Sequence, residues 1–391
     1  MQTAQPQGPL SGIHVLDLTT YLSGPYCTYF LAQMGADVLK VEPPSGDRLR
    51  FIPPARHRGM GGPFLSVNQH KRGVVIDLQT EEGQNHLRRL ASTADVVVHN
   101  MRRKAAEGLG LTYEELRPLN PRLILCRIVG YGQGGPYADL PAFDDPIQGA
   151  TGMAYLQQDR EGRPQYMASA IADKVAGMFA VIAILGALVE RNASGVGQEV
   201  EVPMFECLAS FMLAEHIGGR IFDPPLGPAV FERVLPSIRR PFATRDGFIA
   251  ALVYTDGQWQ RFVGLCGRQD LLTDPAFATV ERRARHYPRL YQILQEVFAT
   301  KTTREWLTLL WEADVPAMPV LSPDDLFSDP HLQAVGFFKA VEHPTEGRLL
   351  LPRFPLLFSR TPAREPGPAP PFPGQGKAAP PGGEGPRDNT K

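Results

Sequence analysis

A strand, a polar loop, a helix and a second strand follow one another early in the sequence, and this succession restricts the fold more than any other feature. Residues 13–18, IHVLDL, are a short run of branched apolar residues typical of a buried strand, and the polar loop TTYLSGP follows them. The stretch YCTYFLAQMG has the character of a helix ending on a glycine, and ADVLKVEPP supplies the next strand. Such a unit is typical of a parallel α/β sheet.

The same alternation recurs in the following ninety or so residues. GVVIDL (73–78) and ADVVVHN (94–100) predict strands on either side of a helix at 81–93, and RLILCRIVGYG (122–132) predicts a strand after a helix at 112–119. In open parallel sheets, ligands bind beyond the carboxyl ends of the strands. We therefore expect a binding site among the segments that follow Leu18, Leu78, Asn100 and Val129.

The length of 391 residues indicates two domains. An apolar, helical section (147–215) follows the strands, and residues 242–318 then combine a strand, FIAALVY, with helices at 257–267 and 289–312. We predict a large α/β domain over 1–225, a smaller α+β domain over 226–330, and a return to the large domain over 331–361. From Pro362 the chain is dominated by proline and glycine, so we expect a disordered tail over 362–391.

Composition narrows the functional class only by exclusion. The formal net charge of −1 gives no field that would attract nucleic acid or an anionic membrane, so an anionic ligand must be held by local groups. The start of the chain lacks the basic and apolar regions of a secretion signal, and the apolar run at 175–189 reads as a buried core helix too short to span a membrane. The scattered cysteines show no metal-ligand spacing. We expect a cytoplasmic protein with reduced thiols and no bound metal.

Common nucleotide and hydrolase motifs are missing from the sequence. The loop after the first strand carries no GxGxxG, which argues against nicotinamide or flavin binding, and GxxxxGK[ST], HExxH and GxSxG do not occur. GYGQGGP (130–136) is a glycine loop that is either a simple turn or a place where a ligand approaches the backbone.

Asp173, in SAIADKVAG, stands immediately before the long apolar stretch. One interpretation makes it an N-cap, because aspartate readily accepts hydrogen bonds from the free N–H groups of a helix start. The other makes it a carboxylate nucleophile that the same N–H groups hold ionised and aimed. The residues around Asp173 do not distinguish the two.

Taken together, these segments resemble the class III CoA-transferase family, which includes formyl-CoA transferase, carnitine CoA-transferase and the α-methylacyl-CoA racemases. The resemblance is carried by PLSGIHVLDLTTYLSGP, GADVLKVEPPSGDRLR, NQHKRGVVIDLQTEEG, ADVVVHNMR, LGLTYEELRPLNPRLILCRIVGYGQGGPY, FDDPIQGATGM, ASAIADKVAGMFAVIAILGALVERNASGVGQEVEVPMFE, FATRDGFIAALVYTDGQW and VPAMPVLSPDDLFSDPHLQAVGFF. It runs over residues 9–361, with many separated motifs in the expected order.

The resemblance implies a fold, a mechanism and a set of contacts. It implies a Rossmann-like large domain, a small domain and an obligate homodimer whose two chains interlock like rings. It implies transfer of CoA from an acyl-CoA to a small carboxylic acid, through an aspartyl anhydride and an aspartyl-CoA thioester, with CoA as substrate and no permanently bound cofactor. The nucleophile of the family falls on Asp173. Its CoA contacts fall on the backbone around Ile76 and Leu78 and on Asn100 and Met101.

Departures from the family pattern narrow the activity. The racemase branch has a histidine directly before an aspartate where this chain has Phe143, which cannot exchange an α-proton, so racemisation is disfavoured although it stays the alternative. The glycine run of the formyl/oxalate branch is missing from residues 230–247, which disfavours that acid pair. Basic residues that hold the CoA phosphates are replaced, and Arg103 or its basic neighbours Arg102 and Lys104 are the candidates to take over. The acyl donor and the acceptor acid stay open; Arg239 and Arg240 either hold a dicarboxylate or form a solvated pair.

Overall fold

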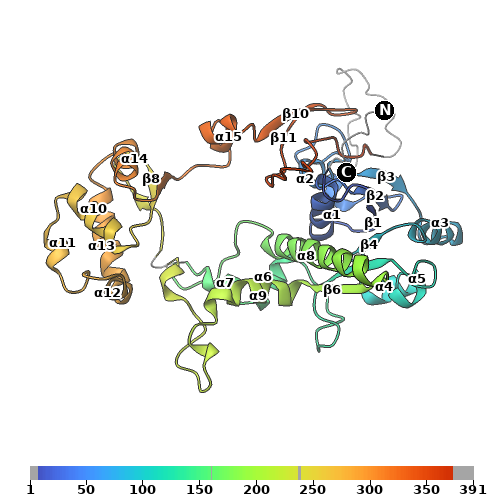
Figure 1. Cartoon of the computed structure of the whole chain (residues 1–391), viewed down its shortest axis with the longest axis horizontal. Helices are drawn as coiled ribbons and strands as arrows, with labels where there is room; N and C mark the ends of the chain where they lie inside the picture. Colours follow the sequence, from blue (N-terminus) through green and yellow to red (C-terminus); the bar gives the residue numbers. More distant parts are fainter. Residues whose placement is uncertain (1–7, 160, 237–238, 373–391) are drawn as a thin grey trace, which may run out of the picture. The chain divides into compact units, whose positions relative to one another are not determined.

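The computed structural model describes residues 8–159, 161–236 and 239–372 (Figure 1). They fall into two compact units. The first, called the sheet unit, comprises the described residues up to Thr151, Ser169–Phe211 and those from His331 onward, and the second, called the small unit, comprises Gly152–Ala168 and Met212–Pro330. The boundary between the two units falls after residue 211, whereas the sequence analysis predicted it after residue 225. This boundary lies within helix α9, where no turn or loop signal in the sequence marks it.

A six-stranded sheet with the order β3-β2-β1-β4-β5-β6 forms the centre of the sheet unit. Its strands are β1 (His14–Asp17), β2 (Asp37–Glu42), β3 (Arg72–Val75), β4 (Val96–His99), β5 (Ile124–Val129) and β6 (Glu199–Pro203). Every neighbouring pair is parallel. The predicted parallel α/β sheet is confirmed. Its strand order is that of doubly wound dinucleotide-binding sheets, in which the order of the strands along the chain reverses between β1 and β4.

The edge strand β6 lies within the section that the sequence analysis predicted to be helical. It pairs with β5 in parallel, with Leu125 opposite Glu199. Two of its glutamates, Glu199 and Glu201, form ion pairs with Arg127 of β5. The prediction failed because a short strand with alternating glutamates carries little of the apolar signal that marks the other strands.

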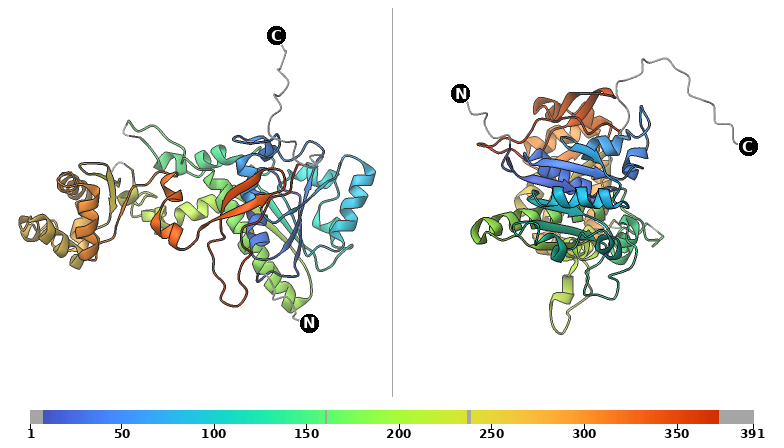
Figure 2. Two further views of the ribbon diagram at one scale, coloured as in Figure 1. Left: turned by 90° about the horizontal axis from the view of Figure 1, so that it is seen from above. Right: turned by 90° about the vertical axis from the view of Figure 1, so that its right-hand side faces the viewer.

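Helices cover both faces of the sheet. On one face lie α1 (Ser23–Gln33) and α8 (Ile171–Ser194), which pack against each other. On the other face lie α3 (Glu81–Ala91), α4 (Arg103–Gly108) and α5 (Tyr113–Leu116), which share one apolar core with the strands (Figure 2). The remaining helices of this unit are α2 (Gly62–Val67), α6 (Asp144–Ala150), the start of α9 (Met204–His216), most of α15 (Pro330–Ala334) and the 3-10 turn η1 (Arg48–Phe51).

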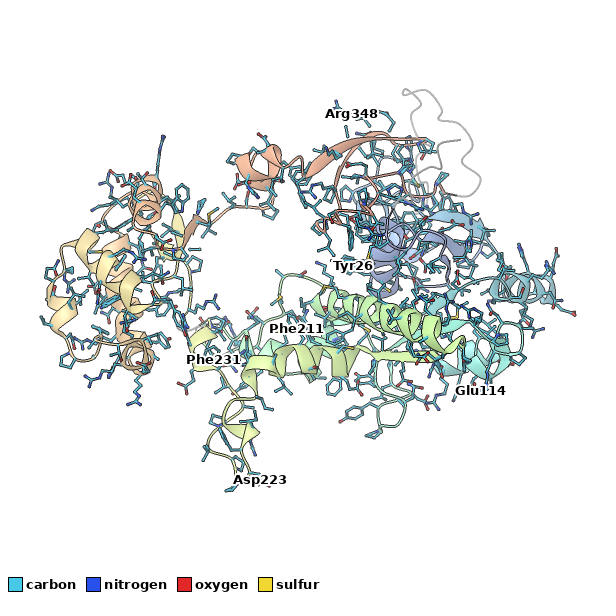
Figure 3. All side chains as sticks on the ribbon, viewed as in Figure 1. Tyr26, Glu114, Phe211, Asp223, Phe231 and Arg348 are labelled. Atoms are coloured by element: carbon cyan, nitrogen blue, oxygen red, sulfur yellow. The ribbon has the colours of Figure 1, made fainter. Side chains whose placement is uncertain are left out.

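Helix α8 is longer than the apolar run at 175–189 suggested. It has 24 residues and, by length and composition alone, is long and apolar enough to cross a membrane, although half of its most apolar window is buried within the protein. Gly177 lets α1 approach α8 closely, since a Cβ there would lie 2.7 Å from the Ser23 carbonyl oxygen and 3.2 Å from the Tyr26 ring (Figure 3). The start of α8 is thereby held beside the start of α1.

The small unit is built around a three-stranded antiparallel sheet of β7 (Phe242–Ala243), β8 (Phe248–Ala251) and β9 (Ala317–Pro319). Helices α10 (Asp256–Cys266), α13 (Tyr287–Phe298) and α14 (Thr303–Glu312) supply most of its core, in which Trp259 and Trp306 are fully buried. The predicted helix at 289–312 is thus two helices. The other helices are α7 (Met153–Leu156), α11 (Asp270–Thr273), α12 (Val280–Arg285) and the 3-10 turns η2 (Gly218–Ile221), η3 (Glu232–Val234) and η4 (Asp325–Phe327).

The C-terminal part of the chain returns to the sheet unit. Strands β10 (Phe338–His343) and β11 (Gly347–Pro352) form an antiparallel hairpin. Residues 362–372, which the sequence analysis assigned to a disordered tail, pack on this unit instead. Arg364 donates to the carbonyls of Gly35 at 2.9 Å and Ala36 at 3.2 Å, and Phe372 makes an edge contact with Phe51. Proline-rich segments form no helix or strand, but they dock where side chains such as Arg364 fix them. The rest of the predicted tail lies outside the described residues.

Candidate active site

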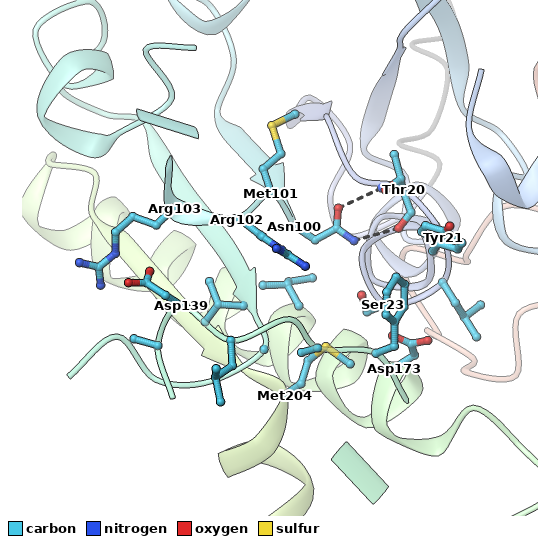
Figure 4. Close-up of a pocket in the computed structure, with 18 of the residues that line it drawn as sticks. Thr20, Tyr21, Ser23, Asn100, Met101, Arg102, Arg103, Asp139, Asp173 and Met204 are labelled. Carbon is cyan, nitrogen blue, oxygen red and sulfur yellow. Dashed lines mark hydrogen bonds between the residues drawn. The ribbon is translucent and has the colours of Figure 1, made fainter. Parts of the chain in front are cut away.

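A cleft of about 560 Å³ opens at the carboxyl ends of β1, β4 and β5 (Figure 4). It adjoins the β1/β4 reversal, which is where doubly wound sheets bind their ligands. Its lining comes from Thr20–Ser23 after β1, Leu49, Asn100–Lys104 after β4, Ile128–Gly130 of β5 and its end, Gln133, Ala138–Leu140, Ala142, Phe143, Asp173 and Met204. All of these residues belong to the sheet unit.

Asp173 lies in the first turn of α8, third in the helix, and its side chain is partly buried at one end of the cleft. The predicted N-cap role is wrong, because Ala170 occupies the cap position and has no side chain that could accept a hydrogen bond. Asp144 of α6 supplies a substitute, since its Oδ1 accepts the Asp173 N–H at 3.1 Å. The Asp173 carboxylate is therefore not needed to satisfy the helix start.

The environment of Asp173 disfavours its charged form. Burial and the neighbouring Asp144 carboxylate raise the pKa of Asp173 from 3.8 to about 6, and the Ser23 side chain opposes them by hydrogen bonding. The expectation that helix N–H groups hold this carboxylate ionised is thus not met by the surroundings of the side chain. At neutral pH the group is still mostly ionised, and a raised pKa makes the carboxylate a better nucleophile than a solvated one.

An aromatic pair borders the cleft beside Asp173. The rings of Tyr21 and Phe143 meet edge to face with centroids 5.6 Å apart, and both residues line the cleft. Phe143 caps α6 with extended backbone, directly before Asp144. The position before Asp144 thus holds a ring that has no proton to give or take.

Asn100 and Met101, both predicted to contact CoA, line the cleft. The Asn100 side chain binds the Thr20 backbone at both ends, donating to its carbonyl at 2.8 Å and accepting from its N–H at 3.0 Å (Figure 4). Asn100 therefore ties the segment after β4 to the loop after β1, and its amide is already engaged on the backbone.

Three basic residues follow Met101 on the same wall. Arg102, Arg103 and Lys104 stand at the start of α4, are exposed and line the cleft. Arg103 donates from Nε to the Gln133 side chain at 2.6 Å and from Nη2 to the Gln133 carbonyl at 3.3 Å. This basic rim suits a phosphate-bearing ligand, and Arg103 also holds the glycine loop in place.

Ile76 and Leu78 are not among the described residues that line the cleft. Ile76 is buried and Leu78 partly buried against the core between the sheet and α3. The Ile76 N–H donates to the Glu42 carbonyl at 2.9 Å, and the Leu78 carbonyl accepts from Gln84 at 3.1 Å. Their predicted contact with CoA stays a prediction. Within the described ranges, no group of three or more His, Cys, Asp or Glu side chains is placed to hold a metal ion.

Sequence reasoning missed several residues of this site. Ser23 and Asp144 meet Asp173 only through folding, since Asp144 is 29 residues from Asp173 and Ser23 begins a different helix. Tyr21 joins the cleft lining from the loop after β1. The rule that ligands bind beyond strand ends points to the loop after β1, but not to which of its side chains faces the cleft.

The chain is similar to known proteins along most of its length. The model of CoA-transferase family III matches residues 10–376. A succinate–glutarate CoA-transferase from Agrobacterium fabrum is 36% identical over 93% of this chain and 92% of its own length. A formyl-CoA:oxalate CoA-transferase from Escherichia coli is 31% identical over 90% of each.

Solved structures add a match of the whole fold. The crystal structure of a CAIB/BAIF family protein from Brucella suis superposes with a TM-score of 0.78 at 31% identity, covering 94% of this chain and 97% of that one. A match of this extent and identity includes residues of both units and is therefore more than a similarity between two parallel sheets. The chain therefore belongs to CoA-transferase family III and is a CoA-transferase.

Proposed function

We propose that the chain transfers CoA from an acyl-CoA to a small carboxylic acid, with Asp173 as the nucleophile. The observation that carries this proposal is the position of the Asp173 carboxylate, partly buried at the end of a cleft whose other wall is basic. A carboxylate in that position meets the thioester end of a ligand whose phosphates bind at Arg102–Lys104. The proposal rests on this geometry and on the family to which the chain belongs.

The first half of the reaction moves CoA onto the enzyme. An Asp173 oxygen attacks the thioester carbonyl, the C–S bond breaks, and CoA leaves as the thiolate while the acyl group stays as a mixed anhydride. The thiolate then attacks the Asp173 carbonyl, the donor acid leaves as a carboxylate, and an aspartyl-CoA thioester remains. Each step exchanges one activated acyl bond for another, so no external energy source is required.

The second half reverses this order with a new acid. The acceptor carboxylate attacks the aspartyl thioester and releases the thiolate, which attacks the acceptor carbonyl of the new anhydride and frees Asp173. Water would hydrolyse each intermediate, so the nucleophile must be shielded. The burial of Asp173 supports that requirement.

The substrate acid is proposed to be small, and the choice between mono- and dicarboxylates is left to experiment. The relative from Agrobacterium fabrum is named for succinate and glutarate. Racemisation, the alternative, is disfavoured because Phe143 offers no acid or base beside Asp144. α-Proton exchange into deuterated water without an acceptor acid would revive it.

We also propose an interlocked homodimer, in keeping with the family resemblance, working in the cytoplasm. The dimer is supported by α8, which exposes the apolar side chains of Met178, Ile182 and Val189 along one face of the helix. Exposed apolar surface of this kind is typical of a protein interface. Measuring mass in solution by light scattering, for the native chain and for Ile182→Glu, tests the dimer.

The experiment that tests the function is transfer of CoA from succinyl-CoA to a panel of short mono- and dicarboxylates. Asp173→Asn should abolish transfer to every acid and keep the melting temperature, because the amide has the same shape. Asp145→Asn, which removes an exposed carboxylate of α6, is the matched control and should retain transfer. Transfer by the Asp173→Asn chain would contradict the nucleophilic role.

A further inference from the structure

The loop that joins β1 to α1 (residues 18–22, the β1–α1 loop) holds a strained residue beside the site. Tyr21 has a φ of 63°, a left-handed conformation that bulky side chains rarely adopt. Its N–H donates to Asp47 Oδ1 at 3.1 Å, and the carbonyl of Thr19 accepts from Lys40 Nζ at 2.9 Å. Such a conformation persists only where the surrounding structure determines it, and here Lys40 and Asp47 supply that structure.

Lys40 and Asp47 also bind each other. Nζ and Oδ2 lie 2.9 Å apart, and both side chains are fully buried. Asp47 Oδ1 accepts a further hydrogen bond, from the Leu49 N–H at 2.9 Å, which fixes the carboxylate within its own turn. Because desolvation offsets most of the attraction in a buried ion pair, net stability alone does not account for it. What the pair does achieve is a rigid connection between the β1–α1 loop and the segment after β2.

The charges around this pair favour the protonated form of Lys40. The buried ion pairs Asp17–Lys71 and Glu42–Arg50, with distances of 3.1 and 2.7 Å, lie nearby. Burial would lower the pKa of Lys40, but the surrounding carboxylates, Asp17 first, outweigh it and raise the pKa above its ordinary value. Titration of Lys40 therefore does not contribute to a pH profile near pH 6.

Ser23, the first residue of α1, directly follows the β1–α1 loop and lines the cleft together with Asp173 (Figure 4). Hydrogen bonding by its side chain lowers the pKa of Asp173. Asp144, facing Asp173 from α6, acts in the opposite sense. Lys174 is next in sequence, but its ammonium donates to Ser169 Oγ at 2.7 Å. A displacement of the loop would thus change the charge state of Asp173 through Ser23.

We propose that Lys40 and Asp47 are positioning residues, whose buried ion pair holds the β1–α1 loop so that the Ser23 side chain lies against the Asp173 carboxylate. This inference rests on the proposed nucleophilic role of Asp173. It assigns a task to two residues that do not line the cleft and that no contact with the substrate would identify.

The test is the acid limb of the kcat/KM profile for transfer from succinyl-CoA, measured with the native chain and with Asp47→Ala. The alanine removes both the attraction to Lys40 and the oxygen that accepts the Tyr21 N–H, and so releases the loop. We expect the limb to move to higher pH by roughly half a unit or more, because Asp173 loses the hydrogen bond that favours its charge. Ser23→Ala should move it in the same direction. The double variant should move it no further, since both changes act through one contact.

Two further variants separate positioning from general stability. Arg191→Gln breaks a buried ion pair with Asp95 (3.0 Å) near the far end of α8, and should lower the melting temperature while leaving the limb in place. Lys40→Gln combined with Asp47→Asn replaces the ion pair by two amides that can bind each other, and should restore the limb toward its native position.

An unchanged limb in a folded Asp47→Ala chain would overturn the inference, as would an equal displacement in Arg191→Gln. If Asp47→Ala does not fold, Asn100→Ala decides instead. This substitution frees Thr20, which belongs to the β1–α1 loop, from the Asn100 side chain. We expect the same upward movement of the limb, and an unchanged limb overturns the inference. Activity in Asp173→Asn would overturn the proposed function instead, so the two failures are distinct.

Discussion

Replacing Asp144 by asparagine tests how the cleft sets the pKa of Asp173. The asparagine keeps an oxygen that can accept the Asp173 N–H, which Asp144 Oδ1 now accepts at 3.1 Å. Gln148, which donates to Asp144 Oδ2 at 2.6 Å, can turn its amide to accept from the new NH₂ group. The substitution therefore removes one negative charge and leaves the geometry nearly unchanged.

The expected magnitude follows from the two causes of the raised pKa. Together, burial and Asp144 raise the pKa of Asp173 from 3.8 to about 6, which corresponds to roughly 3 kcal/mol against the ionised form. Burial is the larger cause. The charge of Asp144 thus accounts for less than half, or roughly 1 kcal/mol, and its removal should lower the pKa of Asp173 by about 0.5–1.

The sign follows from the proposed mechanism, in which only ionised Asp173 attacks the thioester. A lower pKa extends activity to lower pH, so the acid limb of kcat/KM should move down from about pH 6. The assay is transfer from succinyl-CoA between pH 4.5 and 8, with Asp145→Asn as the matched control. Asp145 carries the same charge one residue away but is exposed, so solvent screens it. A limb that stays in place or moves up in Asp144→Asn, or that moves equally in Asp145→Asn, would refute the reasoning.

Three other changes have defined outcomes. Arg103→Ala should raise KM for CoA thioesters roughly fivefold or more with little change in kcat, because it removes the charged contact that we propose with phosphate. Arg117 is an exposed arginine after α5, and Arg117→Ala should leave steady-state kinetics unchanged. Gly130→Ala should abolish activity and lower the melting temperature, because the new Cβ would lie 2.3 Å from the Ala142 Cβ. A Cβ at Gly134 meets nothing within 4 Å, so Gly134→Ala should change neither measurement. A chain ending at residue 361 should have an unfolding free energy, measured in urea, at least roughly 2 kcal/mol below that of a chain ending at residue 372. The shorter chain loses the contacts of Arg364 and Phe372. Equal stability of the two chains would show that residues 362–372 contribute nothing.

Most of the sheet could be predicted from the sequence, because its strands are apolar and buried. Val96–His99 and Ile124–Val129 are buried except for the partly buried Arg127, so each reads as a mostly apolar run. Glu199–Pro203 was missed because an edge strand is paired on one side only and tolerates charged residues. The packing of residues 362–372 was missed because it depends on Arg364 and Phe372 meeting surfaces far away in sequence.

The site divides in the same way. Asp173 and the basic residues after β4 could be located from motifs and strand ends, as local features of the chain. The pKa of Asp173 could not, because it depends first on burial and then on Asp144 and Ser23, which reach it from other helices. The cap position was misjudged by three residues, since Ala170 and not Asp173 is the N-cap of the helix.

The central claim is that Asp173 carries the acyl group and then CoA during turnover. The most direct measurement incubates the native chain with succinyl-CoA, adds hydroxylamine, and locates the modified residue by mass spectrometry of peptides. We predict a hydroxamate on Asp173, formed from the aspartyl-CoA thioester only when succinyl-CoA is present, and none on Asp144 or Asp145. A hydroxamate on another residue, or turnover of succinyl-CoA without any trapped aspartyl group, would contradict the account.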